Sequence, residues 1–493
     1  MGQDPLERRT FESLVVTKFM GTGFKSVEDQ SDAGDSVSVV NEMMRTIQMG
    51  LVAGLVGLPS LAFAQVINPN PTLIQFGTLQ AVGSSTSVSS YRGQFVDRGR
   101  NSGVRDKPRA SASGLPLEPV NVRLGAFILS PTIDYDTFQT DNAKRASTNG
   151  QSDTGYIIRP RMTLASNWSR HAVSFGAGVA GTVYQDFSTE DSTDLELQAA
   201  GRLDIRRGAN LQAAYRYYEG TESRSTAGLP VNVAEPGQFE SSALTVGGVW
   251  ELTRTRLSAN VDVSDVSFDP VPLTNGTTLS QIDRNSEGAA LTLRTDFALT
   301  PSTAIFASGT YGTRNYQERT GGLFPSRDSD QSQAMVGVNF DLSNLARGEL
   351  AVGYLAQSFD AALYDDSEAF GYRAAVEWFP STLLTVGVVA TRNITDSPVQ
   401  GSGSAITTGL GGQVDWDVRS NLVLSARAQR EIFEYDNVVR RDERTTLTAS
   451  GALLLTQWLS VVFNVTNEKL ETNNAAGLNF EETRYGVRLS LRR

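Results

Sequence analysis

A two-residue alternation of side chains is clearest in Leu195-Glu196-Leu197-Gln198-Ala199-Ala200-Gly201-Arg202-Leu203-Asp204-Ile205-Arg206. Odd positions are apolar or small, and even positions are mostly polar or charged. Because successive side chains of a β-strand point to opposite faces, the stretch predicts a strand with one apolar and one wet face. A soluble sheet can produce the same pattern, so the rest of the chain has to separate the two cases.

The alternation recurs along residues 122–493, in about eighteen segments without a helical pattern between them. The first strand is expected to run from Val122 to Tyr135. Short turns are expected at 169–170, 207–210, 253–256, 300–303, 341–348, 379–382, 419–421 and 455–457. Longer connections are expected at 139–154, 188–194, 219–240, 269–285, 317–331, 360–365, 396–405, 436–442 and 471–479. An even number of strands with short and long connections in alternation predicts a transmembrane antiparallel outer-membrane β-barrel of about 18 strands, with lipid outside and periplasmic N- and C-termini.

Aromatic residues separate by type along the expected strands. The tryptophans, each beside a short turn, are Trp168, Trp250, Trp378, Trp416 and Trp458. Tyrosines and phenylalanines gather near the long connections at Tyr135, Phe138, Tyr184, Phe187, Tyr217, Phe268, Tyr316, Phe359, Tyr435 and Phe480. Because aromatic rings with a polar edge prefer the membrane–water interface, we expect two aromatic girdles, one at each end of the strands.

Composition narrows the class of protein. The chain has 493 residues, 40% of them hydrophobic and 20% charged, which is too polar for a helical membrane protein. From Val122 onward no apolar run approaches the ~20 residues that a spanning helix needs. The net charge of -11 disfavours a nucleic-acid partner. The absence of cysteine fits an envelope protein that meets oxidising machinery.

The N-terminal part is expected to contain a targeting signal followed by a tail outside the barrel. An apolar stretch after Met44-Arg45 ends in Ala62-Phe63-Ala64, which predicts a signal peptide at 43–64, with a membrane anchor as the alternative. Residues 1–42 are then an upstream extension, either a mis-assigned start or a segment removed with the signal. Residues 65–118 are rich in Ser, Gly and Arg, which favours a disordered periplasmic tail over a plug of the barrel, and 119–493 form the barrel domain.

The phase of the alternation predicts which charged residues face the lumen. They are Arg159, Arg161, Glu196, Arg202, Asp204, Arg206, Arg216, Asp262, Arg294, Asp296, Arg373, Glu377, Asp415, Asp417, Arg427 and Arg488. Mixed signs on neighbouring strands permit ion pairs that hydrate and brace the wall. The alternative is that these groups contact a hydrophilic cargo, for which about eighteen strands leave room. Whether loop 219–240 folds inward is not determined by the pattern.

Catalytic, cofactor and metal sites are not expected. The single histidine, His171, lies in the turn after Trp168, on the expected periplasmic side, and has no obvious nucleophile partner there. The acidic groups at Glu190-Asp191 and Asp365-Asp366 offer oxygen ligands of the kind calcium takes, but they lack a fixed spacing. We therefore interpret these acidic groups as solvated loop residues. We do not expect the protein to be an enzyme.

The first two hairpins carry a family resemblance. Arg123-Leu124-Gly125-Ala126-Phe127-Ile128-Leu129-Ser130-Pro131 leads to Tyr135-Asp136-Thr137-Phe138, followed by Arg159-Pro160-Arg161 and Asn167-Trp168-Ser169-Arg170-His171. This resembles the putative β-barrel porin type 2 family of proteobacterial outer membranes, over residues 122–493. Members often accompany exopolysaccharide-synthesis genes, so the resemblance implies passage of a polysaccharide. The chain departs from the usual aromatic last residue by ending in Arg492-Arg493.

Three functions follow as hypotheses. The leading one is a monomeric hydrophilic conduit for exopolysaccharide or capsular polysaccharide, acting with periplasmic export components. The others are a passive porin for small hydrophilic solutes and a closed barrel whose loops act as a surface receptor or adhesin. In each case the partners include outer-membrane lipid and the barrel-assembly machinery.

Overall fold

The computed structural model describes residues 122–317, 324–342, 345–473 and 479–492. The predicted extension, signal peptide and tail at 1–118 lie outside the described residues and stay predictions. Within the described residues no helix is both long and apolar enough to cross a membrane.

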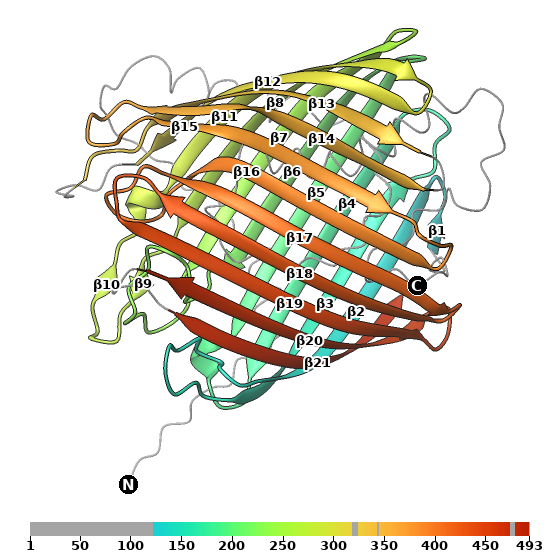
Figure 1. The fold of residues 1–493 in the computed structure, drawn as a ribbon. Helices are drawn as coiled ribbons and strands as arrows, with labels where there is room; N and C mark the ends of the chain where they lie inside the picture. The colour runs from blue at the N-terminus through green and yellow to red at the C-terminus, as the bar shows by residue number, and fades with distance from the viewer. Residues whose placement is uncertain (1–121, 318–323, 343–344, 474–478, 493) are drawn as a thin grey trace. The chain divides into compact units, whose positions relative to one another are not determined.

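Eighteen long antiparallel strands form one closed ring (Figure 1), which confirms the predicted all-β barrel and its strand number. They are β2 (Phe127–Thr140), β3 (Asp153–Ser166), β4 (Ala172–Tyr184), β5 (Ser192–Arg206), β6 (Ala209–Thr221), β7 (Gln238–Glu251), β8 (Thr255–Phe268), β11 (Ser286–Thr300), β12 (Thr303–Tyr316), β13 (Ser329–Asp341), β14 (Ala346–Phe359), β15 (Ser367–Trp378), β16 (Leu384–Asp396), β17 (Ser404–Arg419), β18 (Leu422–Tyr435), β19 (Arg440–Leu454), β20 (Leu459–Thr472) and β21 (Phe480–Arg492). The ring closes where β21 pairs with β2, from Thr132↔Arg492 to Thr140↔Arg484.

The connections alternate between the two ends of the barrel as predicted, and eight of the nine connections expected to be long are long. The exception is the one expected at 436–442, which is a turn of only residues 436–439, shorter than the 379–383 turn at the other end. The long loops add a small hairpin, β9 (Val271–Pro272) with β10 (Thr278–Leu279), and two single-turn helices, η2 (Ser188–Glu190) and η3 (Ile282–Arg284). Both β2 and β21 meet the short turns, so the chain enters and leaves the barrel at the same end.

The predicted first strand from Val122 to Tyr135 is wrong at its beginning. Residues Val122–Leu124 form a separate short strand, β1, which folds back on β2 with Val122↔Leu129 and Leu124↔Phe127. Gly125, at φ 62°, supplies the left-handed backbone of the intervening turn. Because β21 reaches β2 only as far as Thr132, β1 covers the strand edge that would otherwise be unpaired.

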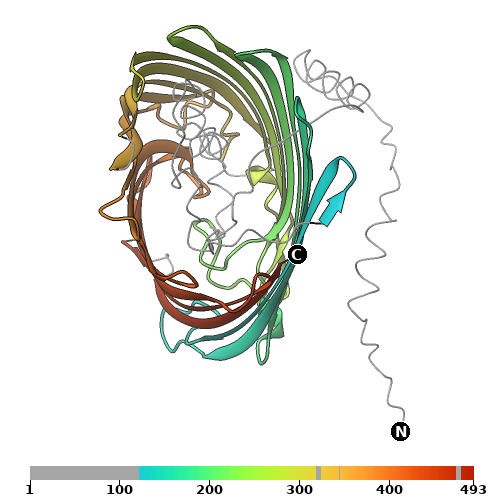
Figure 2. The ribbon, with the colours of Figure 1, turned by 90° about the vertical axis from the view of Figure 1, so that its right-hand side faces the viewer.

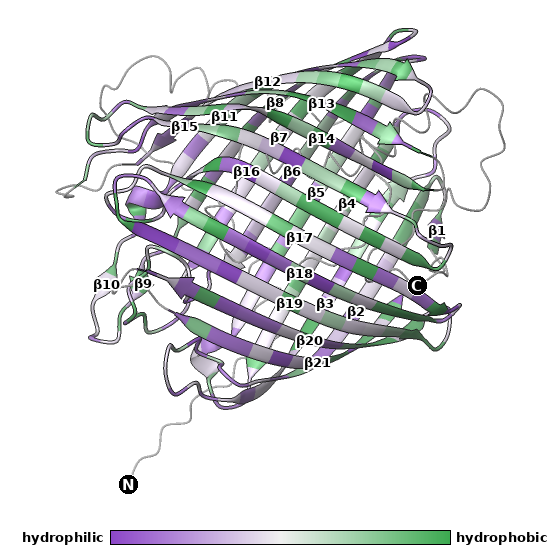
Figure 3. Cartoon of the chain, in the orientation of Figure 1, coloured by the Kyte–Doolittle hydropathy of each residue, from purple (hydrophilic) through white to green (hydrophobic). Residues whose placement is uncertain are grey.

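The two faces of the wall are inverted relative to a soluble sheet. On β2, Ile133 and Tyr135 are 49% and 40% exposed, whereas Asp134 and Asp136 between them are 7% and 5% exposed. Figure 3 shows the resulting alternation of apolar and polar bands along the strands. An apolar outer face on every side of a closed ring is stable in lipid and costly in water, so this wall belongs in a membrane.

The aromatic residues divide between the two faces. All five tryptophans are exposed beside the short turns, and their role as an interfacial girdle stays a prediction. At the long-loop end, Phe138, Phe268, Tyr435 and Phe480 are buried, so these members of the expected second girdle were wrongly placed. Their strands pair so that these rings share the interior face with Asp136, and they pack against inward-folded loops. Exposed tyrosines at other positions stand on the outer face: Tyr135, Tyr156, Tyr215, Tyr311, Tyr354 and Tyr485.

Candidate functional site

The strand register places fifteen of the sixteen predicted lumenal residues on the interior face, the face that carries Asp136. Arg206 is the exception. A register shift between Asp204 and Arg206 pairs Arg206 with Ala209, which lies opposite the outward Trp250. The Arg206 guanidinium then lies 4.5 Å from the centre of the Trp250 ring, because a β-bulge reverses the alternation locally.

Carboxylates and arginines of the interior wall form ion pairs across strands. Asp136 of β2 binds both Arg159 of β3 and Arg488 of β21, the latter with Nε–Oδ1 at 2.7 Å, so the closing seam of the barrel is bridged on its wet side. Arg294 of β11 contacts Asp296 at 2.8 Å and Glu349 of β14 at 2.9 Å. The Asp136 pairs join neighbouring strands, and the Arg294–Glu349 pair reaches from β11 to β14 on the interior face, so none of these charges is exposed to lipid.

Other lumenal charges lie in more open surroundings. Arg216 pairs with Glu196 at 3.0 Å, and Arg202 pairs with Asp204 at 3.0 Å. Arg427 donates to Gln413 at 2.7 Å. Arg202 and Arg216 remain about half exposed, so their guanidinium groups stay available to water in the lumen. Both alternatives for the lumenal charges, bracing and contact with a cargo, therefore have residues suited to them.

Loop 222–237, between β6 and β7, crosses the interior of the barrel at the long-loop end. In the ring, β17 lies nine strands from β6, diametrically opposite in a barrel of eighteen. Yet Ala227 of the loop is buried against Ala405 of β17 and against Phe433 and Tyr435 of β18. Figure 2 looks along the barrel and shows green loop segments inside the ring. We call this segment the crossing loop, and it answers a question that the alternation left open.

The far contact of the crossing loop is close enough to require glycine. Gly228 has φ 92°, and a Cβ added there would lie 2.2 Å from the backbone oxygen of Pro398, in the β16–β17 loop. Both the left-handed backbone and the close approach exclude a side chain at this position. The tip of the crossing loop is therefore seated directly on the opposite wall.

A buried ion pair anchors the beginning of the crossing loop. Glu222 is fully buried and binds Arg284 of η3, with Oε2 to Nη1 at 2.9 Å. The Arg284 guanidinium also lies 4.0 Å from the centre of the Phe268 ring. Removing either charge would leave the other buried without its partner, so the pair is a strong local constraint.

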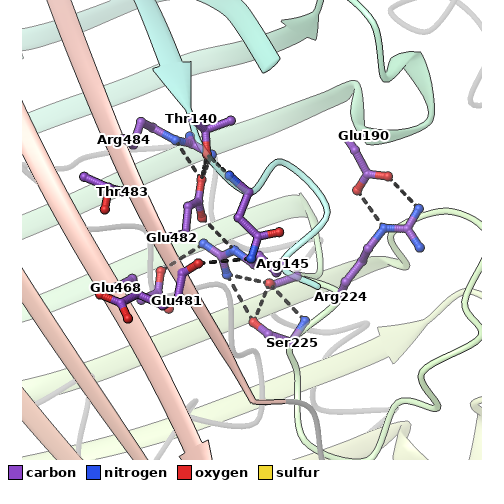
Figure 4. A network of polar contacts seen from close by, with 12 residues as sticks. Thr140, Arg145, Glu190, Arg224, Ser225, Glu468, Glu481, Glu482, Thr483 and Arg484 are labelled. Carbon is purple, nitrogen blue, oxygen red and sulfur yellow. Dashed lines mark hydrogen bonds and ion pairs between the residues drawn. The ribbon is translucent and has the colours of Figure 1, made fainter. Parts of the chain in front are cut away.

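Arg145, in the β2–β3 loop, joins the crossing loop to the wall of β20 and β21 (Figure 4). Its Nη1 donates to Ser223 at 2.7 Å and Ser225 at 3.1 Å, and its other nitrogens bind Glu468 at 2.9 Å and Glu482 at 3.0 Å. Burial alone lowers the pKa of Arg145, but Glu468 and Glu482 outweigh it and raise that pKa above its ordinary value. The cation therefore stays charged while it bridges four side chains.

Arg224 makes a third attachment, seen at the right of Figure 4. Its Nε donates to Glu190 Oε2 at 2.7 Å, and its guanidinium also donates to the backbone oxygens of Val233 and Ala234. The returning half of the crossing loop is held by the β9–β10 hairpin, since Ala234 donates its N–H to the Pro272 oxygen at 2.8 Å. The loop is thus fixed at its start, middle and return.

The long-loop end of the barrel is its mouth, and the sequence pattern did not predict the loop residues that interact there. Alternation assigns a side chain to a face only within strands. The available signal was an arginine in three different long connections, Arg145, Arg224 and Arg284. Glu190, which we considered as a calcium ligand, pairs with Arg224 instead. Within the described residues no group of His, Cys, Asp and Glu is arranged to hold a metal ion.

His171 has a structural contact in the described turn. Its backbone N–H donates to Asp204 Oδ2 at 3.0 Å, and its Nδ1 accepts the N–H of Asp204 at 3.0 Å. With φ 59°, His171 adopts the left-handed turn conformation. The histidine thus joins the β3–β4 turn to β5.

Comparison with known proteins shows which family and which solved structures this barrel is similar to. A family described as "Putative beta-barrel porin 2" matches residues 115–493. OccAB4 of Acinetobacter baumannii shares 12% identity over 75% of this chain and 99% of its own, with a TM-score of 0.42. OccK1 of Pseudomonas aeruginosa shares 11% over 74% and 99%, with a TM-score of 0.39. A mutant of the ferric enterobactin receptor PfeA of Pseudomonas aeruginosa shares 8% over 74% and 80%, with a TM-score of 0.42. The search of curated proteins finds no match.

The protein is an integral outer-membrane β-barrel in a lipid environment, of a porin class that is non-enzymatic. The chain belongs to the putative beta-barrel porin 2 family, as its first two hairpins indicated.

Proposed function

We propose that the barrel is a hydrophilic conduit for an extracellular polysaccharide. The observation that carries the proposal is the interior wall, where paired and half-exposed arginines and carboxylates line a ring of eighteen strands. A barrel of this size leaves room for an aqueous channel. Charged groups of both signs can form hydrogen bonds with the hydroxyl groups of a polysaccharide. Because the signs are mixed, the wall would not bind either cations or anions tightly.

The long-loop end supports a sugar cargo more specifically. A partly exposed interior aromatic ring there lies beside an arginine, since the Arg216 guanidinium is 5.8 Å from the centre of the Tyr218 ring. A flat apolar ring next to hydrogen-bond donors suits a pyranose, which has apolar C–H faces and polar edges. The crossing loop limits free diffusion, which suits regulated passage of a polymer better than an open solute pore. The family resemblance points to the same cargo.

The proposed direction of transport follows from the loop lengths. Outer-membrane barrels have short periplasmic turns and longer outer loops, so we place both chain ends in the periplasm and the crossing loop at the cell surface. In this orientation a monomer receives the polymer from periplasmic export components at the short-turn end. A passive porin for small hydrophilic solutes is the second candidate, favoured by Arg202 and Arg216, whose guanidinium groups are open to the lumen. A closed receptor or adhesin is the third, favoured by the crossing loop.

The test is the amount of surface and secreted polysaccharide in a strain that lacks this gene. We expect external polymer to fall and to return with the wild-type gene. Arg427→Gln, on the interior face of β18, should restore less polymer than Arg430→Gln, on the outer face of the same strand. Unchanged polymer in the deletion strain would contradict export, and single-channel conductance would then separate a porin from a receptor.

A further inference from the structure

The wall has one short ladder, between β15 and β16. The register of these strands runs from Trp378↔Val386 only to Tyr372↔Arg392. On either side the ladders continue to the long-loop end, to Gln357↔Ser367 between β14 and β15 and to Asp396↔Ser404 between β16 and β17. The long-loop ends of β15 and β16 have therefore separated, while each keeps its other neighbour.

The end of the β16–β17 hairpin lies inside the barrel. Ile394 is only 2% exposed and packs with Phe306, Met335, Ala351, Leu355 and Ala369, which belong to the interior faces of β12 to β15. The backbone oxygen of Ile394 accepts a hydrogen bond from Gln331 of β13 at 3.3 Å. We call residues 393–407 the hairpin tip, and this arrangement its tucked position.

Polar contacts hold the tucked position. Asp396 pairs with the buried Arg314 of β12, and its Oδ1 accepts a hydrogen bond from Gln357 of β14 at 2.9 Å. At the long-loop end, the buried Ser367 of β15 and Ser404 of β17 have their hydroxyl oxygens 2.6 Å apart. Side chains of the β16–β17 hairpin thus reach β12, β14 and β15 where the ladder between β15 and β16 has ended.

The alternation of the tip contradicts its interior location. Ile394 has the phase of the outward residues Leu384, Val386 and Val388 on β16, with Ala390 and Arg392 between them in the same phase. Its register partner Ile406 has the phase of the outward residues Leu410 and Val414 on β17. The last register pair of β15 and β16 is Tyr372↔Arg392. If the ladder continued by two more residues in this antiparallel register, Ile394 would lie opposite Phe370. Phe370 is 62% exposed on the outer face. The sequence of the tip therefore suits a lipid-facing wall as well as the interior.

We propose that the hairpin tip is a gate with two positions. In the tucked position it fills the mouth and seats the crossing loop through Ala405 and Pro398. In the second, zipped position it pairs with residues 367–371 of β15, turns Ile394 and Ile406 to lipid, and completes the wall. Zipping removes the tip from the lumen and takes away the far seat of the crossing loop. Wall closure and mouth opening are therefore one movement.

Opposing interactions make both positions accessible. Zipping restores backbone hydrogen bonds along an edge that faces the membrane, where unpaired backbone groups are costly. Tucking buries Ile394 and joins Asp396 to Arg314. Zipping would also place Asp396 opposite Glu368, and like charges directly opposite are unfavourable. Asp396 therefore favours the tucked position, and its charge sets the balance. This gate does not depend on which cargo passes.

Cysteine pairs test the gate directly, because the chain contains no cysteine. Phe370→Cys with Ile394→Cys reports the zipped position, and Ser367→Cys with Ser404→Cys, whose hydroxyl oxygens are 2.6 Å apart, reports the tucked one while leaving Asp396 in place. Val376→Cys with Val388→Cys, a register pair in the short ladder, is the matched control. We expect both test pairs to cross-link in outer-membrane vesicles with a short thiol cross-linker. Single-channel conductance should be higher in the zipped cross-linked form and should return to the uncross-linked value on cleavage.

Asp396→Asn should shift cross-linking of the 370/394 pair upward, since it removes both the attraction to Arg314 and the repulsion from Glu368. Heat-modifiable migration on a gel identifies variants that fail to fold, and Ala369→Cys with Thr395→Cys is the replacement zipped pair. Full cross-linking of the control with none of either zipped pair would overturn the gate. Equal conductance of the zipped and tucked forms would overturn it as well. The amount of polysaccharide exported by the deletion strain tests the proposed conduit, and it is independent of the cross-linking and conductance results that test the gate.

Discussion

The short-turn and long-loop halves of the barrel hold their interiors by different means. At the short-turn end, Arg202 and Asp204 pair at 3.0 Å while 45% and 26% exposed, and water shares the site. At the long-loop end, Glu222 and Arg284 pair at 0% and 8% exposure beneath folded loops. Exposed pairs are worth little, whereas breaking a buried pair is costly. The first half is a strand wall that is open to the lumen at Arg202 and buried at the Arg294–Glu349 pair, whereas the second is a packed closure built from loops.

Breaking the buried pair should give the largest difference between the halves. Arg284→Ala leaves the Glu222 carboxylate buried without its cation, which should cost about 3–5 kcal/mol in the packing of the crossing loop. Arg202→Ala, its counterpart at the short-turn end, should cost about 0–1 kcal/mol. Limited proteolysis of the crossing loop and single-channel conductance measure the effect. Equal protease sensitivity of the two variants would contradict the contrast between the halves.

Arg145→Lys should weaken the bridge from the crossing loop to β20 and β21. An ammonium group cannot reproduce the forked geometry that reaches Ser223, Glu468 and Glu482 together. Losing one charge-assisted hydrogen bond should cost about 1.5–3 kcal/mol. Hydrogen exchange of the crossing-loop amides is the measurement. Lys144→Arg, at the neighbouring position, is the control and should leave exchange unchanged.

Gly228→Ala tests the seat of the crossing loop on the opposite wall. The added Cβ meets the Pro398 oxygen, and the left-handed backbone alone should cost about 1–3 kcal/mol. Gly276→Ala is the matched control, because Gly276 has φ 80° but open space around its Cβ position. Exchange near Pro398 should rise only in the first variant. The same rise in both would mean that backbone strain, rather than the seat, explains the effect.

Asp191→Asn should give the smallest change, confined to the β4–β5 loop. Burial is the largest cause that raises the pKa of the Asp191 carboxyl, although its hydrogen bond from the Tyr184 N–H opposes the shift. A raised carboxyl pKa in the folded state gives stability at low pH that is lost as pH rises through that pKa. The loop should therefore loosen slightly on going from acid to neutral pH. The Asn variant should lack this dependence when Tyr184 exchange is followed against pH, and a persisting dependence would assign it to another group.

The alternation of residues 122–493 was sufficient to predict the barrel and its strand number, and the register places fifteen of the sixteen charged residues singled out for the lumen on the interior face. Each of these follows from a local period of two, combined with a membrane that demands an apolar exterior. The same local character explains two of the errors near strand ends. At Gly125 a turn interrupts the alternation, and at Arg206 a bulge reverses it.

The mouth depended on contacts between residues far apart in the chain. The sequence around Glu222, Arg284, Arg145 or Gly228 does not predict which residue each one contacts. They lie in the long connections, where side-chain direction does not follow the two-residue alternation of a strand. Ile394 is the sharpest example, since its phase predicts lipid while its packing with Leu355 places it inside. Secondary structure follows from neighbours in sequence, whereas closure of this mouth follows from neighbours across the barrel, and these exist only once the ring has formed.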